Sequence, residues 1–120
     1  MQSETIEQAK KDVIAVYGEA VRFAREGTQS LMRINSVELY PTCRPPATPM
    51  LVVFEQSQAK PLVYVQPGQL LANGRVPKNS STILVAGESW MQFSFNIPWS
   101  EGDNIMRFIA AARQRFTQDE

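Results

Sequence analysis

The sequence predicts an α+β protein: an N-terminal helix, an antiparallel sheet meander and a C-terminal helix, arranged in one domain over residues 1–120. Apolar residues recur at three- and four-residue steps near both ends of the chain, as they do in amphipathic helices. Between these ends lie short segments of β-type residues, separated by turns that contain proline or glycine. This arrangement is typical of antiparallel strands joined by short connections.

The first helix is expected from residue 5 to about residue 26. Thr5 and Gln8 have the spacing of a capping box, in which each side chain satisfies a free backbone donor. Gly27 can take the left-handed conformation that ends many helices, and it is the expected stop. The predicted buried stripe consists of Ile6, Ala9, Val13, Tyr17, Ala20, Val21 and Ala24.

Five strands are expected between the helices, at residues 36–42, 50–56, 61–67, 81–88 and 90–97. Residues 41–49 carry four prolines, which predicts a rigid loop because proline donates no ladder hydrogen bond. The apolar segment 50–56 is expected at the centre of the sheet. The alternative is an edge position, where it could pair with a partner strand or with a second copy in a homo-oligomer.

The last strand and the second helix follow each other closely. Within residues 90–97, the apolar side chains of Met91, Phe93, Phe95 and Ile97 alternate with Trp90 and polar residues, so the Met91 set is expected to face the core. Ser100 is the expected N-cap of a helix that reaches residue 117. Glu101 and Asp103 would then lie in its first turn, where negative charge favours the helix dipole.

Composition excludes several kinds of chemistry. The chain has no histidine and a single cysteine, Cys43, so histidine-based catalysis, a histidine or thiolate zinc site and an internal disulfide are all excluded within it. We therefore expect no metal and no cofactor.

Twelve basic and twelve acidic residues balance, which argues against nucleic acid or a membrane surface as the partner. The polar N-terminus and the absence of a long apolar run predict a cytoplasmic protein.

The segment WMQFSFNIPWSEGDNI, residues 90–105, resembles the C-terminal signature of prokaryotic members of the ubiquitin-conjugating-enzyme (UBC)-like superfamily. In that signature a W-x-x-[WF]-S stretch precedes a P-W-x-x-G segment and a helix. Upstream, AKPLVYVQP (residues 59–67) is similar to the UBC-like strand that follows a proline-rich turn. The resemblance covers about residues 60–116, and it implies a helix, a four-stranded meander and a C-terminal helix.

The resemblance also implies the handling of a ubiquitin-like protein as a thioester on a cysteine between the last meander strand and the tryptophan. Residues 68–89 of this chain contain no cysteine. The residue that is central to the chemistry is therefore missing, and the chain resembles an inactive, adaptor-like relative, comparable to RWD domains.

Four residues are candidates for a functional site. Cys43 lies in the proline-rich loop, which would expose it, and the adjacent Arg44 would lower its pKa. Cys43 is thus a weak candidate for a nucleophile or a redox-sensitive thiol, and the alternative is an incidental cysteine. Trp90 and Trp99 could bind a partner, because tryptophan is enriched at interface hot spots. The favoured alternative is that both pack the corner between the last strand and the helix against the first helix and the sheet.

The carboxylates of Glu88, Glu101 and Asp103 are also conceivable acid–base groups, but helix capping accounts for the last two. The resemblance, together with the missing cysteine, thus implies a catalytically inactive UBC-like binding or accessory subunit of a bacterial ubiquitin-like system, whose partner would be a ubiquitin-like protein or its activating enzyme. Recognition would use Cys43, Arg44, Trp90 and Trp99. The alternatives are a conjugating enzyme that forms its thioester on Cys43, and a small structural or immunity-type interaction protein outside ubiquitin-like pathways.

Overall fold

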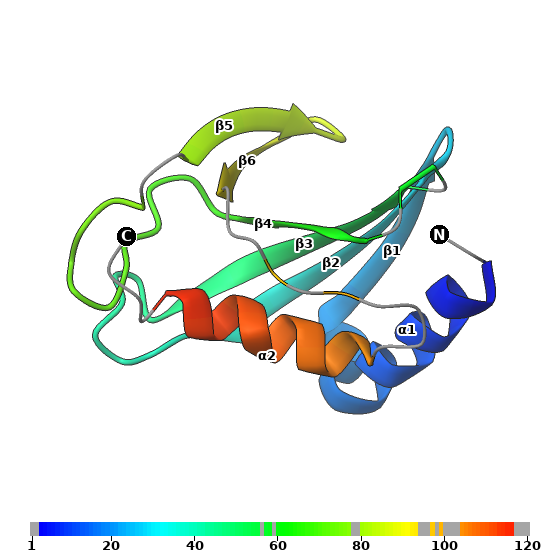
Figure 1. The fold of residues 1–120 in the computed structure, drawn as a ribbon, viewed down its shortest axis with the longest axis horizontal. Coiled ribbons are helices and arrows are strands. Elements are labelled where there is room, and N and C mark those ends of the chain that lie inside the picture. Colours follow the sequence, from blue (N-terminus) through cyan, green and yellow to red (C-terminus); the bar gives the residue numbers. More distant parts are fainter. Residues whose placement is uncertain are drawn as a thin grey trace.

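The computed structural model describes residues 3–55, 57–58, 60–77, 80–93, 97, 99 and 104–116. It confirms the predicted α+β order, with a helix at each end of an antiparallel sheet (Figure 1). No helix in these ranges has the length and apolar character to cross a membrane. The elements are α1 (Ser3–Tyr17), the 3-10 helix η1 (Gly18–Ala20), β1 (Val21–Glu26), β2 (Gln29–Glu38), β3 (Ala47–Glu55), β4 (Leu62–Val65), β5 (Ser80–Val85), β6 (Glu88–Phe93) and α2 (Ile105–Arg115).

The first helix is shorter than predicted. It ends at Tyr17, and Gly18 has a φ of 55°, the left-handed conformation that glycine adopts without steric cost. Residues Val21–Glu26 form strand β1 instead of the last turns of a helix. The prediction failed because periods of 2 and 3.6 cannot be separated over so few residues. Gly27, predicted to stop the helix, lies in the turn between β1 and β2 and has a φ of 58°.

The six strands form one sheet in the order β1-β2-β3-β4-β6-β5, and every neighbouring pair is antiparallel. Strands β1 to β4 follow one another as a meander, but not with the predicted bounds. The first expected strand, residues 36–42, is replaced by β2, and the expected loop, residues 41–49, ends where β3 begins at Ala47. The β5–β6 hairpin then joins the far side with β6 beside β4, so β5 is an edge strand. Strand β3, which contains the segment 50–55, lies between β2 and β4. Its predicted central position is therefore confirmed, and the alternative that it is an edge strand is wrong.

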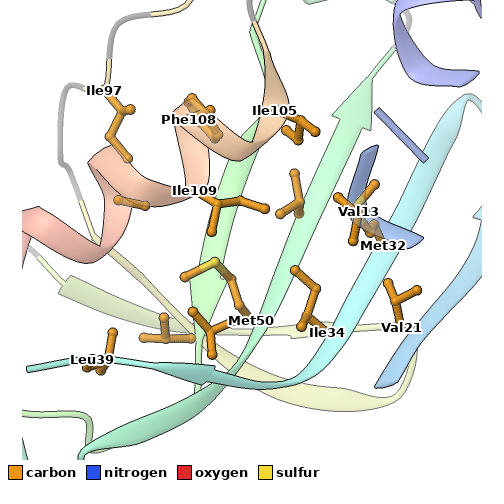
Figure 2. Close-up of a cluster of buried hydrophobic side chains, with 14 of the residues drawn as sticks. Val13, Val21, Met32, Ile34, Leu39, Met50, Ile97, Ile105, Phe108 and Ile109 are labelled. Carbon is orange, nitrogen blue, oxygen red and sulfur yellow. The ribbon is translucent and has the colours of Figure 1, made fainter. Parts of the chain in front are cut away.

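The main hydrophobic core lies between the sheet and the two helices. Figure 1 shows α1 and α2 on the same side of the sheet. In Figure 2, Ile105 and Ile109 of α2 face Met50 and Ile34 of the sheet, and all four side chains are fully buried. Met91 and Ile97 also belong to this core, as their place in the alternating pattern predicted. The side chains of Phe93 and Phe95, the other two residues of that set, lie outside what is described.

A second, smaller core lies on the opposite face of the sheet. In Figure 1 the β5–β6 hairpin lies on the side of the sheet away from α2. Partly buried side chains of β5, among them Ile83 and Val85, pack against this cluster. Because side chains of β5 pack over this face and the helices cover the other, the sheet buries apolar side chains on both faces. The members of the second core are Leu31, Leu51, Val53, Tyr64 and Trp90.

Helix α2 begins at Ile105, later than predicted. Its N-cap is Asn104, whose side-chain oxygen accepts a hydrogen bond of 2.7 Å from the backbone N–H of Met106. The first turn of the helix contains no acidic residue. The expected cap and first-turn acids, Ser100, Glu101 and Asp103, lie outside the described residues.

Candidate functional site

The proline-rich loop between β2 and β3 is held by its own hydrogen bonds. The Arg44 guanidinium folds back over the loop, and its Nη1 donates to the carbonyl oxygens of Pro41 at 2.9 Å and Cys43 at 3.0 Å. The backbone N–H of Cys43 donates to the carbonyl of Tyr40 at 2.9 Å. These bonds satisfy backbone groups that proline, which lacks an N–H, cannot pair in a ladder. Arg44 therefore organises the loop on which it lies.

A buried glutamine fastens this loop to the segment after β4. Gln69 is fully buried, and its Nε2 donates to the carbonyl oxygens of Pro45 at 2.8 Å and Leu70 at 3.1 Å. The backbone N–H of Leu70 donates in return to the carbonyl of Arg44 at 3.0 Å. Since a buried amide is costly unless it is hydrogen-bonded, these contacts explain why a polar side chain lies here. The sequence offered no signal for Gln69, because the contact that fastens the loop is made to the backbone of Pro45, 24 positions away.

The end of α2 joins the same corner. The carbonyl of Phe116, the C-cap residue of the helix, accepts a hydrogen bond of 2.7 Å from the backbone N–H of Ala72. Phe116 is itself fully buried in the main core. The proline-rich loop and the end of α2 are therefore both hydrogen-bonded to residues 69–72, which positions them relative to each other.

The thiol of Cys43 is enclosed in this corner. The prediction that the loop exposes Cys43 is wrong, because the residue is fully buried and belongs to the main core. Burial raises the pKa of the Cys43 thiol, since a thiolate is poorly solvated there. A hydrogen bond with the Tyr40 backbone and the charge of Arg44 act in the opposite direction without reversing the shift. The predicted decrease in the pKa is therefore wrong in sign, and a protonated, inaccessible thiol is a poor nucleophile.

A groove with a volume of about 530 Å³ runs between the proline-rich loop and α2. Tyr40, half exposed, and Pro41 form the loop side, while Arg113 lies on the helix side and its Nε donates to the carbonyl oxygen of Glu38. Tyrosine and arginine are the residue types, with tryptophan, that carry most binding energy at protein interfaces. The groove is lined by Leu39, Tyr40, Pro41, Ala110, Arg113 and Gln114.

The helix that forms one wall of this groove is basic. Arg107, Arg113 and Arg115 lie within Ile105–Arg115, a helix without an acidic residue. The positive charges of Arg113 and Arg115, in the last turn, interact favourably with the negative end of the helix dipole. The dipole therefore accounts for two of the three arginines. Arg107, near the start of the helix, gains nothing from the dipole and is exposed. A surface of this charge favours a partner with acidic side chains.

The two tryptophans lie on opposite faces of the sheet. Trp99 packs against the main core, and its ring meets that of Phe108 on α2 edge to face, with centroids 5.5 Å apart and planes at 89°. Trp90 belongs to the second core, is 2% exposed, and has the Arg33 guanidinium 5.5 Å from its ring centroid. The predicted packing at the corner with the last helix therefore holds for Trp99 and is wrong for Trp90.

The sequence-predicted site residues are thus not brought together. Cys43 and Arg44 share the proline-rich loop, and the two tryptophans lie elsewhere on different faces. Their role in partner binding stays a prediction. Among the described residues, no cluster of three or more cysteine or acidic side chains could hold a metal ion. Tyr40 and Arg113 were missed, although an aromatic residue directly before a proline-rich stretch was the available signal for the first.

Comparisons with protein-family models, curated proteins and solved structures found no match for this chain.

Proposed function

We propose that this protein is a catalytically inactive subunit that binds another protein without forming a covalent bond to it. The observation that carries the proposal is the burial of Cys43, the only cysteine of the chain. With no histidine and no accessible thiol, the chain lacks the groups that most commonly carry acyl transfer. What the molecule does offer is an organised corner with interface-type side chains.

The proposed binding surface is the groove between the proline-rich loop and α2. Tyr40 supplies a large side chain with few rotatable bonds, and the hydrogen bonds of Arg44 and Gln69 hold the loop that carries it. A loop that is already ordered loses little conformational entropy when a partner binds. Arg113 adds a positive charge at the other wall, so the expected partner presents an acidic surface.

The proposed context is a bacterial ubiquitin-like system, in which the partner is a ubiquitin-like protein or the adenylating enzyme that activates it. This part rests on the resemblance of residues 90–105 to the UBC-like signature. The observed order of helix, meander and C-terminal helix is the order that the resemblance implied, which supports it. The hairpin β5–β6 and the separation of Trp90 from Trp99 are features of this chain that the resemblance did not imply.

The direct test is a binding measurement by isothermal titration calorimetry, using the full chain with purified bacterial ubiquitin-like proteins and their activating enzymes. Tyr40→Ala and Arg113→Glu are each expected to weaken the complex by roughly tenfold or more, the size of effect typical of interface hot spots. Arg107→Glu is the matched control, because it makes the same charge change on α2 outside the groove. It is expected to have a much smaller effect.

Three results would overturn the proposal. Binding that is unaffected by both groove variants would place the interface elsewhere, and a tight complex with an unrelated protein alone would favour the immunity-type alternative.

A thioester assay addresses the enzyme alternative. The chain would be incubated with activating enzyme, ATP and ubiquitin-like protein, and analysed on non-reducing gels beside Cys43→Ala. A thiol-sensitive adduct that Cys43→Ala abolishes would establish a conjugating enzyme in place of a binding subunit.

A further inference from the structure

Within the part of the chain that the structure describes, strand β1 forms one edge of the sheet and pairs on one side only, with β2. The unpaired side of an edge strand presents free backbone donors and acceptors to another strand. The register with β2 determines which side chains of β1 share a face. Arg22 is opposite Arg33, Ala24 is opposite Leu31, and Glu26 is opposite Gln29. Arg22, Ala24 and Glu26 therefore lie on the face away from the helices, and all three are exposed.

We propose that two copies of this chain associate through antiparallel pairing of their β1 strands, which makes one continuous sheet across both copies. A two-fold axis that relates two antiparallel strands must stand perpendicular to the sheet, so one residue lies opposite its own symmetry mate. Placing Ala24 on the axis sets Arg22 opposite Glu26 of the second copy, and Glu26 opposite Arg22 of the second copy. Strand β1 is thus complementary in charge to itself.

Two charged residues of β1, Arg22 and Glu26, have no side-chain partner among the residues that the structure describes. The nearest cross-strand neighbour of Arg22 is Arg33, which has the same charge and is already paired with Glu88. Neither Arg22 nor Glu26 makes a hydrogen bond or ion pair with another described residue. Opposite charges on directly opposed strand positions are stabilising and like charges are destabilising. A second copy would therefore supply each of these residues with a partner of opposite charge.

The face of β1 toward the helices carries apolar surface next to the same edge. Phe23 is 37% exposed, and the Lys10 ammonium of α1 lies 5.7 Å from its ring centroid. With Ala24 on the axis, Phe23 would face Arg25 of the second copy, a pair suited to a cation–π contact. A groove of about 340 Å³ lies between α1 and β1, and Phe23, Ala24 and Arg25 help to line it.

The other edge of the sheet lacks this complementarity. Strand β5 (Ser80–Val85) contains no charged residue, so no ion pair can define its register against a second copy. A two-fold axis through Thr82 would set Ser80 against Leu84. The β1 edge therefore provides the more specific self-association. It contributes no residue to the groove beside α2, so the proposal can fail or succeed independently of the proposed function.

Sedimentation equilibrium of the full chain from micromolar to millimolar concentration tests the pairing. The mass is expected to rise from 13.5 kDa toward twice that value, and to rise less at high salt because exposed ion pairs are screened. Arg22→Glu and Glu26→Arg, each made alone, put like charges opposite each other and are expected to raise the dissociation constant by at least about tenfold. Both positions are exposed, and circular dichroism verifies that each variant is folded.

Mixing the two variants gives the decisive result. A dimer with one copy of each restores both ion pairs, so an equimolar mixture is expected to dimerise at concentrations where neither variant does alone. The double variant Arg22→Glu/Glu26→Arg is expected to dimerise with itself. Leu84→Lys, at the β5 edge, is the control and is expected to leave the dimer intact. A wild-type monomer at all concentrations, a dimer insensitive to Arg22→Glu, a mixture that stays monomeric, or loss of the dimer with Leu84→Lys would each overturn the proposal.

Discussion

Arg33 on β2 and Glu88 on β6, 55 positions apart in the sequence, form a bidentate ion pair. The Arg33 Nε and Nη2 lie 3.1 Å from the Glu88 Oε1 and Oε2, respectively. Two strands separate β2 from β6, so in a flat sheet these backbones would be roughly 14 Å apart at about 4.8 Å per strand. The ion pair therefore reaches across β3 and β4, and the Arg33 guanidinium also lies over the Trp90 ring.

Removing this ion pair is expected to make stability less dependent on acid pH. The hydrogen bond to Arg33 is the main cause that holds the pKa of Glu88 below its usual range. A carboxyl whose pKa is lowered by folding stabilises the protein above its unfolded pKa of about 4.3, and this contribution is lost as pH falls through the folded pKa. The pair is partly exposed, so we expect less than about 1 kcal/mol. Urea unfolding of Glu88→Gln at neutral and acid pH measures it.

The stability difference between wild type and Glu88→Gln should shrink toward acid pH. An equal difference at all pH values would contradict the role assigned to the ion pair.

Truncating the two tryptophans is expected to give unequal losses of stability. Trp90→Ala removes a 2%-exposed side chain from the second core, and we expect a loss of about 3–5 kcal/mol in the free energy of unfolding. Trp99 is only partly buried, so Trp99→Ala should cost less. Chemical denaturation monitored by circular dichroism measures both. Leu84→Ala, at an exposed position, serves as the control and should change stability by less than about 0.5 kcal/mol. Equal losses for both tryptophans would contradict the burial described.

The turn between β5 and β6 offers a stabilising substitution. Val85 pairs with Glu88, and the two residues between them, Ala86 and Gly87, both have positive φ angles, 51° and 80°. Two-residue hairpins of this geometry favour Asn-Gly, because asparagine tolerates the left-handed conformation better than alanine does. Ala86→Asn is therefore expected to raise the free energy of unfolding by roughly 0.5–1 kcal/mol. Ala86→Val, which adds a β-branched side chain there, should lower it. Thermal unfolding of both variants decides the sign.

Alkylation of Cys43 is expected to be slow in the folded protein. Burial both shields the thiol and raises its pKa, so labelling should accelerate only at pH values above the free-thiol pKa of about 8.5. The same shift makes folding stability fall as pH rises from the unfolded pKa through the folded one, since the unfolded state deprotonates first. Stopped-flow labelling with iodoacetamide, with urea-unfolded protein as the reference, measures the protection. Rapid labelling of the folded protein at neutral pH would contradict the burial and reopen the covalent alternative.

The elements of regular structure could be predicted where the local pattern was long enough. The apolar stripe of α1 around Val13 and the alternation around Met91 both placed the correct side chains in the main core. The residues Val21–Glu26 were assigned to the wrong element, because six residues satisfy both a helical and a strand pattern. The sequence signal for separating a helix from a strand here was Gly18, since glycine readily takes the left-handed conformation that it has where the helix ends.

The candidate site could be predicted only in part. Proline content correctly marked the loop around Cys43, and the alternation of β6 put Trp90 on the face opposite Met91. Whether that face was covered, and by what, depended on the β5–β6 hairpin folding back over the sheet. The groove between Tyr40 and Arg113 joins residues more than seventy positions apart, and the bonds of Gln69 hold one wall of it.

The sequence by itself therefore determined the fold class, the absence of histidine chemistry and the residues that alternate between faces, since these follow from composition and short-range periodicity. Only the tertiary structure decided the strand order, the burial of Cys43 and the separation of Trp90 from Trp99. These features depend on which elements pack against each other, and a local pattern specifies that a face is apolar without specifying what will cover it.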